Sequence, residues 1–254
     1  MGWNENELLR LEGVCLSNRD VSCRDISLSL HTGEILVVFG PEKSGAELIC
    51  PIIIGMEESF EGDVLFKGES IKGLDYLGRL NYRKSLGYLQ KNYGLISNMT
   101  VEENIALPLK YHSRLSSAEI KSVVDGFIAE LNLEHCRSRR PVDLDNAEVL
   151  KTAYARAIAL EPELLLIEHA LEGQCLLNSQ VFMASLRKRS ASPERSVIIF
   201  TYEPERFFDF STRFVMLYEG AIVFSGTRDD FLAMENDYLQ QYMKSSVQGP
   251  MRIL

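Results

Sequence analysis

The chain has no apolar run long enough to cross a membrane. Its longest apolar stretch, 48–56, is nine residues and contains Pro51, whereas a membrane helix needs about 20 residues. Its five cysteines are odd in number and form no C-x-x-C pair, a pattern typical of a reducing compartment without a cysteine metal site. The net charge of −9 argues against a nucleic-acid surface, which needs clustered positive charge. We therefore expect a cytoplasmic protein with no metal ligands, no nucleic-acid partner, and membrane attachment only through another protein.

The sequence does contain alternating strand-like and helix-like segments. With 254 residues, it can hold one large domain or two modest ones. Short apolar runs predict strands at 9–14, 26–30, 35–39, 62–68, 163–168 and 196–201, with a hairpin at 214–218 and 221–225. Helical spacing predicts helices from about residue 45, from 117, over 150–160 and in the last 25 residues. This alternation indicates an α/β core, and the mainly helical block 92–143 is typical of an insertion.

One loop has the glycines of a phosphate-binding loop but neither its lysine nor its hydroxyl. Gly40 and Gly45 follow the apolar run 35–38 with the spacing of G-x-x-x-x-G-K-[ST]. In such a loop, backbone N–H groups and the lysine hold phosphates, and the hydroxyl binds Mg²⁺. Here Ala46 takes the lysine position and Glu47 the hydroxyl position. The candidate nucleotide-binding residues of this loop are Gly40, Pro41, Glu42, Lys43, Ser44, Gly45, Ala46 and Glu47.

Two interpretations of the only cation in this loop remain open. Lys43 could act as a relocated lysine that reaches a phosphate, or it could be a solvated lysine paired with Glu42 or Glu47. Backbone N–H groups near the two glycines could still hold a phosphate, but the two carboxylates oppose it by like-charge repulsion. We therefore expect ATP binding to be weak or absent, and we expect no Mg²⁺ site.

The segments around this loop resemble the nucleotide-binding subunit of an ABC transporter. The similarity extends from about residue 9 to residue 250, and the matching segments are 33–34, 60–68, 100–105, 155–157 and 161–166. It implies a P-loop NTPase-type ABC ATPase fold, in which a RecA-like α/β core carries an antiparallel β subdomain and an inserted α-helical subdomain. The implied organisation is a single nucleotide-binding domain over 1–254, with the helical subdomain at 92–148 and a C-terminal extension at 228–254.

Two further stretches resemble the Mla-type branch of this family, which transports lipids. Residues 106–115 are similar to the P-L-x-x-H-x-x-L segment of that branch, and residues 224–250 are similar to its C-terminal end. The resemblance implies a membrane permease as partner, contacted through the helical insertion and the Q-loop region. It places the chain peripherally on the cytoplasmic face of the inner membrane.

The resemblance also implies which residues occupy the catalytic positions. Lys91 takes the place of the Q-loop glutamine, and Tyr202 that of the switch histidine. Glu168 replaces the Walker B aspartate, His169 the general-base glutamate, and Cys175 the D-loop aspartate. Phosphoryl transfer depends on positioning and charge stabilisation by these groups acting together. Their joint replacement predicts a subunit that does not hydrolyse ATP.

The signature motif is replaced as well. The positions of L-S-G-G-Q are occupied by Leu144, Asp145, Asn146, Ala147 and Glu148. Asp145 would bring negative charge toward phosphate, and two residues with side chains replace glycines that allow close approach. In the family, each ATP lies between the Walker motifs of one subunit and the signature of another. In a homodimer, or in a heterodimer with another nucleotide-binding subunit, both composite sites would therefore be damaged.

Alternatives remain for the residues at the Walker B position. His169 could act as a general base, because imidazole titrates near neutrality, or it could be a packed histidine at a strand end. Glu168 and His169 make a poor metal chelate if both lie on a strand, since adjacent residues point to opposite faces. Two other functions stay open: a slow or atypical ATPase that uses Lys43 with this pair, and a stand-alone interaction module on an ABC fold.

Overall fold

The computed structural model describes residue 4 and residues 6–252. The chain forms two compact units. The first, which we call the β-rich unit, comprises residues 1–80 and 196–254, and the second, the helical unit, comprises residues 81–195. Within the described residues, no helix combines the length and the apolar character that crossing a bilayer demands.

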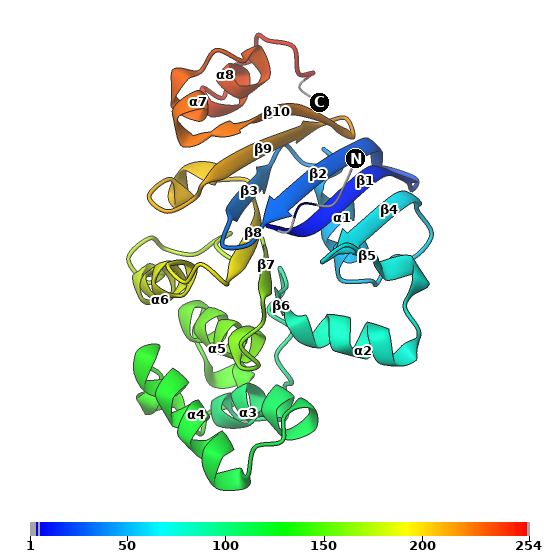
Figure 1. Ribbon diagram of the computed structural model, residues 1–254. Helices are drawn as coiled ribbons and strands as arrows, with labels where there is room; N and C mark the ends of the chain where they lie inside the picture. The colour runs from blue at the N-terminus through cyan, green and yellow to red at the C-terminus, as the bar shows by residue number, and fades with distance from the viewer. Residues whose placement is uncertain (1–3, 5, 253–254) are drawn as a thin grey trace. The chain divides into compact units, whose positions relative to one another are not determined.

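An antiparallel sheet forms one layer of the β-rich unit (Figure 1). Its strand order is β2-β1-β4-β5, with β1 at Glu7–Ser17, β2 at Ser22–His31, β4 at Glu61–Phe66 and β5 at Glu69–Ser70. Leu11 lies opposite Leu28 on one side and Val64 on the other, and all three side chains are buried. Alternation of buried and exposed positions therefore sets the register of this sheet.

The second sheet of the β-rich unit positions the phosphate-type loop. β3 (Ile35–Phe39) lies between the parallel strands β8 (Ser196–Thr201) and β9 (Arg213–Tyr218). All five residues of β3 are buried, as expected for a parallel strand covered on both faces. β10 (Ala221–Thr227) returns antiparallel to β9 through the turn at Glu219 and Gly220, so the predicted hairpin is confirmed.

Helices complete the β-rich unit. They are α1 (Ala46–Ile53), the 3-10 turns η1 (Ile71–Gly73) and η4 (Pro204–Phe207), α7 (Arg228–Ala233) and α8 (Asp237–Met243). The helix α2 (Tyr76–Ser85) spans the boundary between the two units. The helix predicted to follow residue 45 is confirmed, but it is short: Pro51 has no N–H to donate, and the helix ends two residues later.

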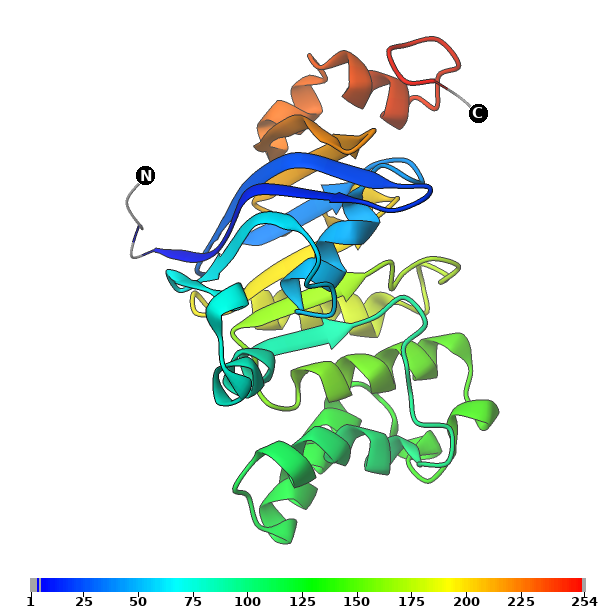
Figure 2. The ribbon, with the colours of Figure 1, turned by 90° about the vertical axis from the view of Figure 1, so that its right-hand side faces the viewer.

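The helical unit is built on two parallel strands and four helices. β6 (Leu86–Leu89) pairs with β7 (Leu164–Glu168), so their carboxyl ends lie side by side. The helices are α3 (Val101–His112), α4 (Ser117–Glu130), α5 (Asn146–Ile158) and α6 (Gln180–Ser190), with the 3-10 turns η2 (Glu134–Cys136) and η3 (Pro141–Asp143). Helix α3 packs against both α4 and α5 (Figure 2).

Capping side chains fix where these helices begin. In α3, the Thr100 side chain accepts from the Glu103 N–H and the Glu103 carboxylate accepts from the Thr100 N–H; Ser116 and Glu119 do the same for α4. The predicted helix start at 117 is thus confirmed. The helix predicted over 150–160 instead starts at Asn146, because a third capping box extends it toward the N-terminus.

An aromatic cluster attaches the C-terminal helices to the β-rich unit. Phe231 on α7 is fully buried, and its ring centroid lies 4.8 Å from that of Phe208 and 5.0 Å from that of Phe214. Phe39, at the end of β3, lies 5.6 Å from the same ring. Such contacts add to the stabilisation from burying a large apolar side chain.

We expect Phe231→Ala to lower the free energy of unfolding by about 3–5 kcal/mol, because it removes a buried ring and leaves a cavity. Urea denaturation of the full chain measures this. Leu232→Ala is the matched control: Leu232 is half exposed on the same helix, and its change should stay within about 0.5 kcal/mol. Equal effects of the two substitutions would contradict the role given to the cluster.

Candidate nucleotide site

Close packing explains why the loop after β3 keeps its glycines. A Cβ on Gly40 would lie 2.2 Å from the carbonyl oxygen of Leu217. A Cβ on Gly45 would lie 2.6 Å from the carbonyl oxygen of Ser22, and Gly45 also has a φ of 100°. Neither position can take a side chain without moving the backbone. The frame of the phosphate loop is therefore held by the fold itself, whatever the loop binds.

Groups of the loop itself accept from several of its N–H donors. The Glu47 carboxylate accepts from the Gly45 N–H at 3.1 Å. The Ser44 N–H donates to the Pro41 carbonyl at 3.1 Å, and the Ala46 N–H lies 3.4 Å from the Ser44 hydroxyl oxygen. In a phosphate loop such donors point at the ligand. Here a carboxylate at the start of α1 lies where an anion would bind.

The lysine of the loop takes no part in these contacts. Lys43 is exposed and has a φ of 62°. Within the described part of the chain, it forms no ion pair with Glu42 or Glu47. The pairing considered from the sequence is thus not observed, whereas its exposure agrees with a solvated side chain.

A tyrosine from the C-terminal helix α8 links the loop to the switch position. The Tyr242 hydroxyl lies 2.8 Å from the Tyr202 carbonyl oxygen and 3.3 Å from that of Gly40. Burial raises the pKa of Tyr242, and the nearby Glu205 carboxylate adds to the shift, so the phenol keeps the proton that it donates. Sequence reasoning missed Tyr242, because nothing local marks a contact across about 200 residues.

In the helical unit, the structure brings the Q-loop and Walker B positions together. Glu168 ends β7, next to the end of β6. The Tyr88 hydroxyl donates to the Glu168 carboxylate at 2.5 Å, and the backbone N–H of Lys91 approaches the same oxygen at 3.5 Å. The Glu168 carboxylate, predicted to take the Walker B position, is therefore held by a phenol and an amide of its own chain.

His169 does not continue the strand. Its φ of 50° turns the chain away after Glu168, so the expectation that both residues lie on a strand is wrong. The turn brings the His169 Nδ1 within 2.5 Å of a Glu172 oxygen. The other Glu172 oxygen lies 3.0 Å from the Lys91 Nζ. Lys91, Glu172 and His169 thus form a continuous row of paired groups.

The electrostatics of this row favour a neutral imidazole. Burial lowers the pKa of His169 below its ordinary value of 6.5; the Glu172 carboxylate opposes this, and the Lys91 ammonium adds to it. A neutral ring that carries its proton on Nδ1, the nitrogen nearest Glu172, leaves Nε2 as an acceptor. That arrangement is chemically able to take a proton, as a general base does. Sequence reasoning also missed Glu172. Its position three residues after His169 is the signal in the sequence that could have identified it as the partner of that histidine.

The residues predicted at the signature positions form a helix cap. Asp145 is the N-cap of α5, and its side chain accepts from the Glu148 N–H at 2.8 Å. The Glu148 carboxylate accepts from the Asp145 N–H, also at 2.8 Å. The carbonyl oxygen of Asn146 accepts from the Gln174 side chain at 3.0 Å, another residue that sequence reasoning missed. The start of α5 is thus capped by two carboxylates.

The lowered pKa of His169 predicts a pH dependence of stability. The unfolded chain takes up a proton near pH 6.5 and the folded chain does not, so the free energy of unfolding falls as the pH drops through 6.5. This fall ends below the pKa of the folded state. Between about pH 7.5 and about pH 5.5, we expect His169→Gln to lose less stability than the wild type.

Urea denaturation across this pH range measures the difference. The exposed His112 provides the control, since His112→Gln leaves the His169 site intact and should keep the wild-type pH dependence. If the free energy of unfolding changes equally with pH in the wild type and in His169→Gln, then His169 has the same pKa in the folded and unfolded states, which would contradict the prediction.

Comparisons with known proteins identify the family of this chain. A family model described as ABC transporter matches residues 23–171. The molybdate/tungstate import ATP-binding protein WtpC of Thermococcus kodakarensis is 34% identical over 161 residues, which are 63% of this chain and 47% of that protein. The sulfate/thiosulfate import ATP-binding protein CysA 1 of Agrobacterium fabrum is 28% identical, over 84% of this chain and 61% of that protein. The chain thus spans 47% and 61% of the length of these two relatives.

A third relative matches along nearly its whole length. The intermembrane phospholipid transport system ATP-binding protein MlaF of Haemophilus influenzae is 22% identical over 250 residues, 98% of this chain and 94% of that protein. Among solved structures, the ATP-binding cassette MJ0796, a dimer bound to ADP and Pi, has a TM-score of 0.78 at 22% identity. The match covers 87% of this chain and 99% of that one, and it supports the predicted ABC ATPase fold. The chain therefore belongs to the ABC transporter family, as an ATP-binding subunit.

Proposed function

We propose that this ATP-binding subunit does not hydrolyse ATP and acts as a structural or regulatory partner of a membrane permease. The observation that carries the proposal is the Glu47 carboxylate on the Gly45 N–H, 3.1 Å away, at the start of α1. A γ- or β-phosphate bound there would have to displace this carboxylate and overcome its charge. Ala46, at the lysine position, offers no compensating cation.

The signature positions support the same conclusion. Asp145 and Glu148 place two carboxylates at the start of α5, and Asp145 takes the position of the signature serine. Because phosphoryl transfer rests on positive charge and on N–H donors around the phosphates, two carboxylates there work against it. A homodimer of this chain would have a defect on both sides of each nucleotide, and a heterodimer with an intact subunit would have a defect on one side of each.

We further propose a lipid-transport system of the Mla type. Of the three relatives named above, MlaF is the one that the chain matches over 98% of its own length and 94% of the relative's length. The segments 106–115 and 224–250 that resemble this branch fall on α3 with the turn after it and on the C-terminal part of the β-rich unit. The chain would then act at the cytoplasmic face of the inner membrane.

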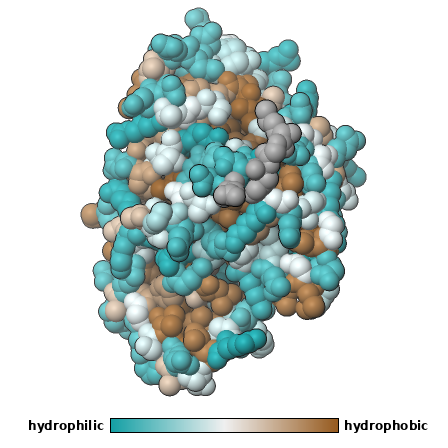
Figure 3. Space-filling model, in the orientation of Figure 1, coloured by the Kyte–Doolittle hydropathy of each residue, from teal (hydrophilic) through white to brown (hydrophobic). Residues whose placement is uncertain are grey.

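A cavity in the helical unit offers a docking site for the permease. Its volume is about 440 Å³. It lies along α3, β6 and α5, and its lining includes Leu86, Tyr88, Leu107, Pro108, Tyr111 and Arg156. Figure 3 shows apolar side chains gathered over the helices of this unit. An apolar recess with one fixed cation suits a short helix from a membrane partner.

A specific observation favours one alternative, a slow ATPase. The neutral His169 paired with Glu172 has the form of a general base and the group that orients it. If this alternative holds, the purified chain with its permease shows turnover that His169→Ala abolishes. A lack of turnover in the intact complex rules it out.

Equilibrium titration with ATP, with and without Mg²⁺, tests the main proposal. We expect no Mg²⁺-dependent saturation of the wild type below about millimolar ATP, because the loop lacks its lysine and carries its own carboxylate. Ala46→Lys combined with Glu47→Ser should raise the affinity at least about tenfold. Glu47→Gln is the control, which removes only the charge. Mg²⁺-dependent micromolar binding by the wild type would overturn the proposal.

A second experiment tests permease docking separately. Tyr111 lines the cavity and is 74% exposed, and Tyr76, on α2, is 80% exposed outside it. We expect Tyr111→Glu to abolish co-purification of an integral membrane protein from detergent-solubilised membranes, since it puts a charge into an apolar recess. Tyr76→Glu should leave it unchanged. Co-purification that survives Tyr111→Glu would argue against this docking site.

A further inference from the structure

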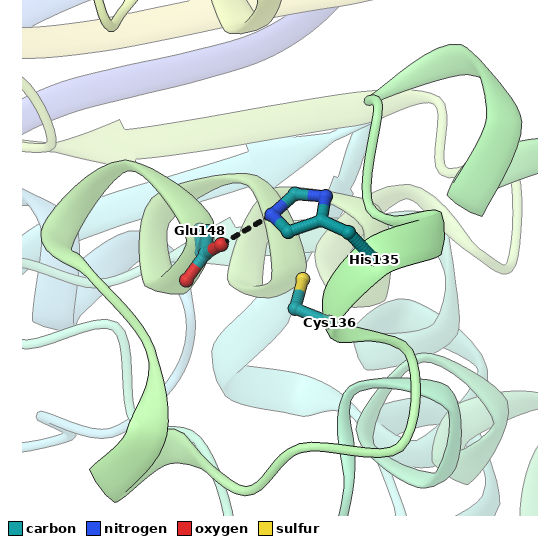
Figure 4. A group of neighbouring side chains, drawn as sticks. All are labelled: His135, Cys136 and Glu148. Atoms are coloured by element: carbon teal, nitrogen blue, oxygen red, sulfur yellow. Dashed lines mark hydrogen bonds and ion pairs between the residues drawn. The ribbon is translucent and has the colours of Figure 1, made fainter.

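Three side chains of metal-ligand type converge in the helical unit. His135 and Cys136 come from the 3-10 turn η2, and Glu148 comes from the first turn of α5 (Figure 4). One donor atom from each, a ring nitrogen, the sulfur and a carboxylate oxygen, lies within 4.8 Å of the other two. Imidazole nitrogen, thiolate sulfur and carboxylate oxygen are the three kinds of protein ligand that Zn²⁺ uses.

Packing and capping hold two of these donors in place. Cys136 is fully buried, and its Sγ lies 3.4 Å from the Leu133 carbonyl oxygen. Glu148 is 7% exposed. One of its oxygens accepts from the Asp145 N–H, and the other lies 2.5 Å from the His135 Nε2. The helix cap therefore occupies one carboxylate oxygen and leaves the second directed toward the cluster.

The third donor sits at the surface and can adjust. The His135 side chain is 57% exposed, so its ring has room to rotate when its contact with Glu148 opens. Zn²⁺ lies about 2.0–2.3 Å from such ligands, which places tetrahedral donors about 3.4 Å apart. The His135–Glu148 contact must therefore open by roughly 1 Å and the thiol must approach. The exposed side of the cluster admits water as a fourth ligand.

We propose that His135, Cys136 and Glu148 form a site for a single divalent transition-metal ion, with Zn²⁺ as the matched ion. The His135 ring nitrogen binds in its neutral form, Glu148 binds through the oxygen that faces the cluster, and the Cys136 thiol releases its proton to solvent and binds as thiolate. The site replaces the expectation, based on cysteine spacing, that the chain has no metal ligands.

Charged groups of both signs surround the Cys136 thiol, so their net effect on a bound cation is small. Lys151 and Arg139 act on the Cys136 thiol as positive charges, and Glu148 and Asp145 act as negative ones. Burial raises the pKa of the Cys136 thiol to about 11, so the ion must displace that proton. Bound metal would tie the turn η2 to the first turn of α5, which carries the signature positions. The proposal does not depend on whether the chain binds ATP.

Cobalt titration tests the site directly, because Co²⁺ bound to thiolate gives a charge-transfer absorption that other ligands do not. In the full-length reduced protein, we expect this band to saturate at one equivalent of Co²⁺ and to disappear when Zn²⁺ is added. Cys136→Ser should lack the band. Cys175→Ser, which changes an exposed cysteine elsewhere, should keep it. The absence of a band in the wild type, or its persistence in Cys136→Ser, would overturn the proposal.

His135→Gln provides a second measurement that does not depend on a buried substitution. It should weaken Zn²⁺ binding at least about tenfold in competition with a chelating dye, and it should remove the rise in thermal midpoint that Zn²⁺ gives the wild type. His112→Gln, at an exposed histidine outside the cluster, should change neither. Unchanged Zn²⁺ affinity in His135→Gln would exclude this residue as a ligand and overturn the site.

Discussion

The N–H groups at the start of a helix need acceptors, and at two sites in this chain its own carboxylates are among those acceptors. Glu47 accepts at the start of α1, and Asp145 with Glu148 caps α5. By resemblance to the ABC family, these residues are predicted to lie in the phosphate loop and in the signature, which meet the nucleotide. Because a carboxylate satisfies the same donors as a phosphate, the two helix starts are stable without a ligand. This constraint connects the stability of the chain to its proposed lack of hydrolysis.

The same principle extends to the Walker B region of the helical unit. The Glu168 carboxylate is held by the Tyr88 hydroxyl, and Glu172 joins Lys91 to His169. Buried and half-buried charges are costly unless they are paired, so charged side chains in this region need partners within the protein. The structure provides them within one unit of the chain. Such pairing agrees with a protein maintained for its fold and its contacts.

The proposed metal site uses a residue of one of these caps. Glu148 takes the fifth signature position, caps α5 with one oxygen and directs the other toward His135 and Cys136. A residue that caps a helix with one oxygen can thus bind another ligand through its second oxygen. The ion would stabilise the start of α5 by linking it to the turn η2, which follows α4.

Local patterns in the sequence were enough to predict much of the fold. The buried run of β3, the hairpin at Glu219 and Gly220, and the start of α4 were all predicted, because periodicity and turn residues act over a few neighbours. The assignment of the catalytic positions to Lys91, Glu168, His169 and Tyr202 stays a prediction from the resemblance. What only the tertiary structure decided were contacts between distant segments: Tyr242 with the carbonyls of Gly40 and Tyr202, and Cys136 beside Glu148. Residue types and spacings do not encode such contacts, since they arise from how strands and helices pack in three dimensions.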